Sequence, residues 1–295
     1  MLDELFGDDE GDEFGDAAPL RRPSACGVLK FHSPAAEEGL FVHLEQLNGK
    51  ECRNNPEATL RMVDLYASTK HWLMCIGPEK GGILEREALV PLVATSTDGV
   101  LVLVELGSYL GYSAVHMAST LLRLGVARDR IRVVSIEGDP MCVQWTRRLV
   151  DFCGLGDLVT VLPSSQGHAA ALEQHLAEVS PQRRVVDLLL IDHDKALYQR
   201  DLAAFEAAGL LRPGSIVAAD NVLSFNKPLS VYLDHVRDPQ RYGSSRLFMA
   251  SIEYADAAGT TDAGAEGLPS EDLDGMEISV YGGGSTDIRS APEHL

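Results

Sequence analysis

The sequence is poor in basic residues, in paired cysteines and in long apolar runs. Its 25 Lys and Arg stand against 44 Asp and Glu, so it lacks the clustered positive charge that a nucleic-acid partner requires. Its 5 cysteines are odd in number and include no C-x-x-C pair, which argues against a disulfide framework and a zinc site. No apolar run approaches the roughly 20 residues that cross a bilayer, and the first residues lack the features of a signal or transit peptide. We therefore expect a cytoplasmic protein with no membrane span and no nucleic-acid partner.

The negative charge is concentrated near the two ends of the sequence. Residues 1–16 contain eight acids and no base, and residues 255–295 contain nine acids and one Arg. We expect an acidic disordered tail over 1–35, one domain over 36–283 with a mobile acidic loop at 255–275, and a C-terminal tail over 284–295. The fragments LDELF and DEF in the first tail suit either a short protein-binding motif or a plain solvating segment.

Helical periodicity covers residues 36–95, and strands alternate with helices from residue 100 onward. The apolar runs expected as strands lie at 100–106, 131–137, 158–162, 185–192 and 215–220. Near-continuous apolar strands joined by amphipathic helices indicate a parallel sheet with helices on both faces. Strands near 244–254 and 276–282 would complete a seven-stranded, mostly parallel α/β sheet.

Acidic and amide side chains gather where these strands end. The first strand ends at Glu105, the second at Glu137, the fourth at Asp192, and the fifth at Asp220 and Asn221. In open α/β sheets, ligands bind beyond the carboxyl ends of the strands. We therefore place the candidate site at this edge.

The turn after the first strand, GSYLGYS, offers Gly107 and Gly111 where the backbone must bend sharply. It is not the G-x-G-x-x-G fingerprint that seats a pyrophosphate, and Glu105 beside it suits a cationic or hydroxyl-bearing ligand. Glu137 stands where a carboxylate commonly binds ribose hydroxyls, although a helix-capping role is an alternative. Together these residues favour a nucleoside cofactor without phosphates.

Asp192, Asp220 and Asn221 offer only oxygen ligands, which suits Mg²⁺ better than zinc. The alternative is that these residues cap a helix or shape a turn. Lys195 lies three residues after Asp192, in the segment IDHDK. A metal ion lowers the pKa of a bound hydroxyl, and a nearby lysine can accept its proton.

Six collinear segments resemble catechol O-methyltransferases, which are class I S-adenosylmethionine-dependent enzymes. They are KHWLMCIGPEKG (70–81), VELGSYLGYSAVHMA (104–118), SIEGDP (135–140), RRLVDFCGLGDLVTVLPSSQ (147–166), IDHDK (191–195) and GLLRPGSIVAADNV (209–222). The similarity runs over about residues 40–255 and implies a Rossmann-like methyltransferase fold.

The resemblance implies a role for each matching residue. Asp192, Asp220 and Asn221 would hold Mg²⁺, Lys195 would be the general base, and Glu253 would bind the second hydroxyl of a catechol or phenolic substrate. Glu137 would bind the ribose of S-adenosyl-L-methionine, and Ser165 and Gln166 its adenine. Other parts of the methyl-donor pocket would be formed by Met74, Ile76, Glu105, Gly107, Tyr109, Tyr112, Ser113, Asp192 and His193. The methyl group already sits on a sulfonium leaving group, so alignment of oxygen, carbon and sulfur does most of the remaining work.

The sequence departs from the family pattern around the substrate. Trp72 matches one tryptophan, but Asp194 stands where a second is expected, and Phe225 replaces a proline. An acid in place of an indole changes the shape and charge of the substrate mouth. We hypothesise that a larger or amine-bearing diol is preferred over catechol itself.

Other functions stay open from sequence alone. The segment DHDKALY also resembles the D-x-D-K-x-x-Y pattern of caffeoyl-CoA-type O-methyltransferases, which share the metal chemistry and would act on a larger phenolic acceptor. A catalytically silent scaffold that binds S-adenosylmethionine is a second alternative, disfavoured because the charged site is intact. A dehydrogenase is disfavoured further by the glycine spacing.

Overall fold

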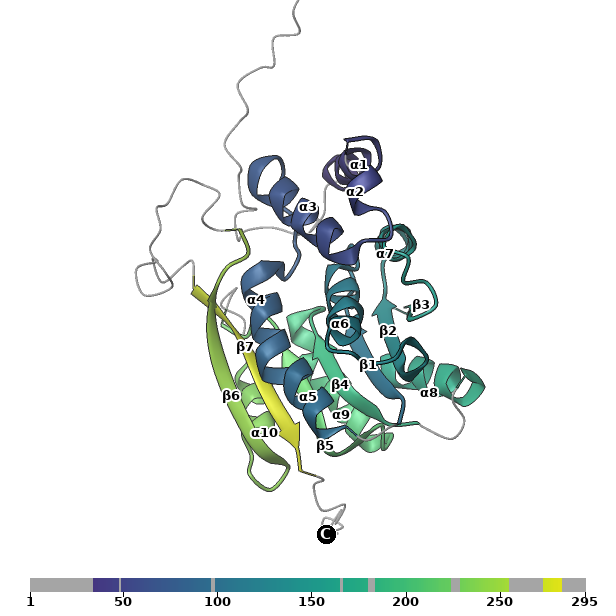
Figure 1. Cartoon of the computed structure of the whole chain (residues 1–295). Coiled ribbons are helices and arrows are strands. Elements are labelled where there is room, and N and C mark those ends of the chain that lie inside the picture. The colour runs from purple at the N-terminus through teal and green to yellow at the C-terminus, as the bar shows by residue number, and fades with distance from the viewer. Residues whose placement is uncertain are drawn as a thin grey trace, which may run out of the picture.

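Seven strands form one mixed sheet in the order β3-β2-β1-β4-β5-β7-β6 (Figure 1). The computed structural model describes residues 34–47, 49–96, 99–164, 167–179, 184–223, 229–254 and 273–282. The strands are β1 (Leu101–Leu106), β2 (Ile131–Glu137), β3 (Val159–Pro163), β4 (Val186–Ile191), β5 (Leu211–Ala219), β6 (Tyr242–Ser251) and β7 (Leu273–Tyr281). The first five run parallel, and β7 pairs antiparallel with both β5 and β6. The predicted mostly parallel seven-stranded α/β sheet is confirmed.

The strand order reverses at β1, which has β2 on one side and β4 on the other. At such a switch point the segments that follow the two strands diverge to opposite sides and leave a crevice at the carboxyl edge. The turn after β1 and the segment after β4 therefore border the same space. This is the edge where the sequence places its acidic residues.

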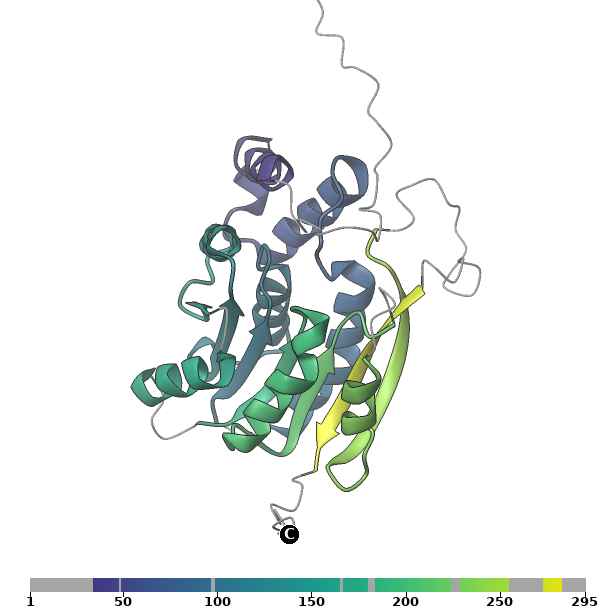
Figure 2. The same cartoon turned by 180° about the vertical axis from the view of Figure 1, so that it is seen from behind.

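Helices cover both faces of the sheet because successive strand residues point to opposite sides. On β1, Leu101 and Leu103 belong to one hydrophobic core, and Val102 and Val104 to the other. The first core is shared with α1 (Pro34–Val42), α2 (Gly49–Cys52), α3 (Pro56–Thr69), α4 (Gly77–Leu84), α5 (Val90–Thr95), α6 (Tyr112–Arg123) and α7 (Pro140–Phe152). The second is shared with α8 (His168–Val179), α9 (Tyr198–Ala207) and α10 (Ser230–Val236), which face the viewer in Figure 2.

The ends of the expected domain differ slightly from the structure. Helix α1 begins at Pro34, two residues before the predicted boundary, and β7 begins at Leu273, inside the segment that we expected to be a loop. Residues 1–33 and 283–295, and the predicted loop over 255–272, lie outside the described residues. Among the described helices, none is long and apolar enough to cross a membrane. The four described cysteines are buried and unpaired.

Candidate active site

The three predicted metal ligands and the predicted base come together at the carboxyl ends of β4 and β5. These strands are neighbours in the sheet, and the Asp220 amide donates to the Ile191 carbonyl at 3.0 Å. Nζ of Lys195 lies 3.1 Å from Oδ1 of Asp192 and 2.9 Å from Oδ1 of Asn221. Lys195 therefore spans two ligands from two different strands.

Lys195 opens a short 3₁₀ turn that Asp194 caps. The Asp194 side chain accepts from the Ala196 amide at 3.0 Å, which orients the turn. The third contact of the Lys195 ammonium is the hydroxyl of Tyr198, at 2.9 Å, and this hydroxyl donates to the Asp220 carbonyl at 3.0 Å. Three acceptors use all three protons of an ammonium group, so Lys195 is held in place by its surroundings.

Asn221 has a left-handed backbone, with φ of 54°, a conformation that Asn adopts more readily than most residues. Its amide nitrogen donates to Asp274 at 2.6 Å and to Glu253 at 3.1 Å. Since both donor protons point toward these acids, the amide oxygen is directed to the opposite side, toward Lys195. Asn221 is thereby fixed with its amide oxygen, the predicted metal ligand, against the Lys195 ammonium that also contacts Asp192.

A buried lysine that we did not predict lies beneath these residues. Lys80 on α4 is 1% exposed and forms ion pairs with Asp220, Glu253 and Asp274. Sequence reasoning missed Lys80 and Asp274 because each belongs to a segment that otherwise reads as an ordinary helix or loop. A lysine between two glycines and a proline in an apolar helix, IGPEKGG, was the only local signal.

The charges of this cluster do not balance. Among the described residues, four carboxylates meet two ammonium groups; the carboxylates belong to Asp192, Asp220, Glu253 and Asp274, and the ammonium groups to Lys80 and Lys195. Burial raises the pKa of Asp220 to about 8, with Lys80 opposing and the neighbouring acids reinforcing the shift. Oδ1 of Asp220 lies 3.0 Å from Nζ of Lys80 but accepts no well-aligned hydrogen bond from any described residue. With all four acids ionised, the cluster would carry two uncompensated negative charges, and the raised pKa of Asp220 opposes this state when no cation is bound. The oxygen-only set therefore fits a divalent hard cation such as Mg²⁺.

The turn after β1 lies directly against the segment after β4. Gly107 has φ of 96°, and a side chain there would collide with the Asp192 carbonyl and the His193 backbone. Gly111 has φ of 85° and would collide with Thr146. Both glycines are therefore required by close approach as well as by backbone conformation, as the sequence suggested.

Glu137 at the end of β2 fixes this turn. One of its oxygens accepts from the amides of Ser108 and Tyr109 at 2.8 and 3.0 Å, and the other from the amide of Asp139 at 2.9 Å. These two turn amides are thus committed to a carboxylate and do not point at a phosphate, which agrees with a phosphate-free ligand. The carboxylate keeps further lone pairs that can accept ribose hydroxyls.

Glu105 is fully buried beneath the same turn. The hydroxyls of Ser113 and Ser135 donate to its two oxygens, each at 2.5 Å. Burial raises the pKa of Glu105 to about 8, although the two hydroxyls oppose the shift. Its role in this structure is to hold Ser113 at the start of α6.

The other predicted residues surround the crevice at different depths. Tyr109 and Tyr112 are buried, and their hydroxyls donate to Glu37 and Asp64 of the helices above. Met74 is 37% exposed, Ile76 is buried, and the indole of Trp72 donates to the Glu253 carbonyl at 3.0 Å. The residues among our predictions that lie outside the described part of the chain are Ser165, Gln166 and Phe225.

His193 presents one ring nitrogen with no partner. Its Nε2 lies 2.7 Å from the carboxylate of Asp201, whereas its buried Nδ1 has no hydrogen-bond partner among the described residues. A buried polar atom without a partner is costly, so Nδ1 is a position where a ligand can contribute a hydrogen bond.

Comparison with known proteins gives consistent matches. A family described as a methyltransferase domain matches residues 104–222. The chain is 34% identical to catechol O-methyltransferase of Bos taurus over 236 residues, which cover 80% of this chain and 74% of that one. It is 32% identical to catechol O-methyltransferase of Sus scrofa over 216 residues, which cover 72% and 96%. An O-methyltransferase from Bacillus cereus, solved with S-adenosylhomocysteine, superposes with a TM-score of 0.51 at 20% identity, covering 77% of this chain and 90% of that one.

Proposed function

Since the chain belongs to the catechol O-methyltransferase family of S-adenosylmethionine-dependent O-methyltransferases, we propose that it methylates one hydroxyl of a catechol-like diol in a Mg²⁺-dependent reaction. The observation that supports this most is the cluster of four carboxylates and two lysines, which would carry two excess negative charges beside Asp192, Asp220 and Asn221 when all four acids are ionised. The family fold alone does not require such a cluster of acids. A reaction that depends on a divalent cation requires acidic ligands to hold that cation.

S-adenosylmethionine supplies an electrophilic methyl group when bound, and Mg²⁺ lowers the pKa of a substrate hydroxyl. The protein has three tasks. The crevice beyond the carboxyl ends of β1 and β4 orients the methyl donor. Glu137 accepts hydrogen bonds from the ribose hydroxyls of this donor. Glu253 accepts a hydrogen bond from the second substrate hydroxyl and so fixes which oxygen attacks. Lys195 accepts the proton of the attacking hydroxyl.

The same oxygens that hold Lys195 are the proposed cation ligands. Oδ1 of Asp192 and Oδ1 of Asn221 account for two of the three acceptors of the Lys195 ammonium. A cation held by these oxygens would compete with Lys195 for both contacts and leave the hydroxyl of Tyr198 as its remaining partner. Nζ would then be free to contact the substrate hydroxyl, whose proton the neutral amine can accept.

Methyl transfer to a panel of catechols tests the reaction class. We expect turnover with Mg²⁺, none in EDTA, and none in Asp192→Asn with Mg²⁺ restored. Asp129→Asn is the matched control, because this acid is exposed and lies in the short turn before β2, at the opposite edge of the sheet. Full turnover of wild type in EDTA would reject the metal-dependent reaction.

The acceptor is a separate question. Asp194 is exposed beside Lys195, so its negative charge supports a preference for an amine-bearing diol. We would compare kcat/KM for catechols with cationic, neutral and anionic tails. The highest kcat/KM for the neutral catechol would reject this preference. The contact between Lys195 and Tyr198 reproduces the K-x-x-Y part of the caffeoyl-CoA-type pattern, which keeps a larger phenolic acceptor as the second candidate. Such an acceptor belongs in the same panel.

A further inference from the structure

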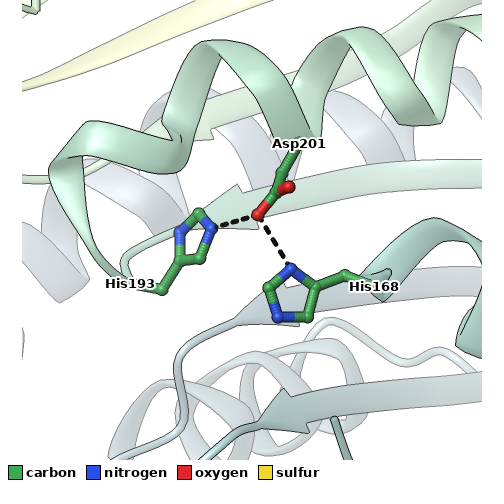
Figure 3. A group of neighbouring side chains, drawn as sticks. All are labelled: His168, His193 and Asp201. Atoms are coloured by element: carbon green, nitrogen blue, oxygen red, sulfur yellow. Dashed lines mark hydrogen bonds and ion pairs between the residues drawn. The ribbon is translucent and has the colours of Figure 1, made fainter. Parts of the chain in front are cut away.

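Two histidines and an aspartate from three different elements meet on the α8 and α9 side of the sheet (Figure 3). His168 is the first residue of α8, His193 follows β4, and Asp201 lies in α9. Nδ1 of His168 and Nε2 of His193 lie 2.9 and 2.7 Å from the same atom, Oδ2 of Asp201. Two rings thus converge on one carboxylate oxygen, and the three atoms lie within 4.8 Å of one another.

The surroundings hold these three side chains in place. Their side chains are only 7%, 11% and 6% exposed. The second oxygen of Asp201 accepts from Nε of Arg200 at 2.8 Å, and the His193 ring stacks on Tyr198 with 5.4 Å between centroids and 9° between planes. Support of this kind around a carboxylate and an imidazole is what orients the ligands of a metal site.

We propose that His168, His193 and Asp201 bind one borderline transition-metal ion, of which Zn²⁺ is the model case. Two imidazole nitrogens and one carboxylate oxygen form a ligand set that suits such an ion and not Mg²⁺. In the metal-free state each ring donates its proton to Asp201. On binding, the ion replaces these two hydrogen bonds, and each ring keeps its proton on the other nitrogen, so no net proton is released.

The required movement of each histidine nitrogen relative to Asp201 is small. With bonds of about 2.0–2.1 Å, tetrahedral ligand atoms lie roughly 3.3 Å apart. The two N···O distances of 2.7 and 2.9 Å therefore need to open by about half an ångström. Three ligands leave the fourth position to water, as in open zinc sites.

Binding of the ion would also change the hydrogen-bonding role of Nδ1 of His193, the nitrogen that now has no partner among the described residues. At present Nε2 carries the proton and Nδ1 is an acceptor; with the ion on Nε2, Nδ1 becomes a donor. His193 directly follows Asp192 and belongs to the proposed methyl-donor pocket. We therefore expect the ion to change the affinity for S-adenosylhomocysteine, an expectation that rests on the proposed function, whereas binding of the ion does not.

Co²⁺ titrated into the full-length protein in excess Mg²⁺ tests the site, because tetrahedral Co²⁺ absorbs far more strongly in the visible than octahedral Co²⁺. We expect one tetrahedral ion per chain, displaced by Zn²⁺. In His168→Gln the affinity should fall by more than about 100-fold, which exceeds the usual effect of losing an outer-shell partner. Glutamine can still donate to Asp201, so the fold should be kept, and thermal melting checks this.

His235→Gln is the matched control. His235 also pairs with a carboxylate, that of Glu206, at 2.9 and 3.0 Å, but its cluster is not one of the three-ligand groups found among the described residues. Its substitution should leave Co²⁺ binding unchanged. Absent tetrahedral bands, or equal bands in wild type and His168→Gln, would overturn the site whether or not the protein methylates catechols. Tight Co²⁺ binding with unchanged S-adenosylhomocysteine affinity in Zn²⁺ would overturn only the coupling.

Discussion

The two lysines of the site contact different members of the acid cluster. Lys80 is 1% exposed and touches three carboxylates, from Asp220, Glu253 and Asp274. Lys195 is 12% exposed and touches one carboxylate, one amide oxygen and one hydroxyl. Lys80 lies on α4, and Lys195 on the short turn between β4 and α9.

The difference suggests a structural role for Lys80 and a role in the reaction for Lys195. A lysine enclosed by three buried acids cannot leave them without a large electrostatic cost, so Lys80 fixes Asp220 and Glu253 in place. Lys195 has weaker partners, and two of these are also the proposed cation ligands. Lys195 can therefore change its contacts during a reaction while Lys80 stays in place.

Lys195→Met should give the largest effect on rate. Loss of a general base costs typically 10²–10⁴-fold in kcat, while the free energy of unfolding should fall by less than in Lys80→Met, because Lys195 contacts one carboxylate and Lys80 contacts three. The measurement is kcat and S-adenosylhomocysteine affinity, with the exposed Lys70→Met as control. If Lys195→Met kept its kcat within tenfold of wild type, another group would be the base.

Lys80→Met should give the largest effect on stability. It leaves three buried acids without their shared cation, and breaking such a pair costs about 3–5 kcal/mol. Urea unfolding in metal-free buffer measures this loss. Millimolar Mg²⁺ should restore more stability to this variant than to wild type, because it replaces missing positive charge. Equal stability of the variant and wild type without metal would show that Lys80 is not the structural cation.

Glu105→Gln should change the pH dependence of stability. The pKa of Glu105 is raised to about 8 in the fold, against an unfolded value near 4.3. The unfolded chain therefore releases this proton first, and wild-type stability should fall as pH rises from about 4 to 8, by on the order of 3 kcal/mol at pH 7. The variant should lack this component in thermal melts from pH 5 to 8. Parallel pH curves for the two proteins would contradict the buried, protonated state of Glu105.

Asp194→Asn should give the smallest effect. The side chain is exposed, so its charge is screened by salt, and the ratio of kcat/KM for cationic and neutral catechols should fall only a few-fold. The effect should shrink further at high ionic strength. A ratio that does not change at low salt would mean that Asp194 does not sense the substrate.

The parallel half of the fold and the ligands at its strand ends were predictable. Apolar runs from 100 to 220 identified β1 to β5, and parallel strands necessarily bring Asp192, Asp220 and Asn221 to one edge. Local sequence carries this information because Asp192 directly follows β4, and Asp220 and Asn221 directly follow β5. The two glycine positions after β1 were predictable for the same reason.

The buried ion pairs of Lys80 were not predictable. Lys80 and Asp274 are 194 residues apart, and they meet because β7 inserts between β5 and β6, an order that no local pattern specifies. The same holds for His168, which reaches Asp201 across 33 residues. Single buried charges on otherwise ordinary helices give no periodic signal, so only the fold shows their partners.

Calorimetric titration of Mg²⁺, combined with methyl-transfer rates in the same samples, tests the central claim most directly. We expect one Mg²⁺ per chain, a rate that rises in proportion to occupancy, and loss of both in Asp192→Asn. Turnover at the wild-type rate in EDTA, or Mg²⁺ binding unchanged in Asp192→Asn, would contradict the assignment of the unbalanced acid cluster to a catalytic cation.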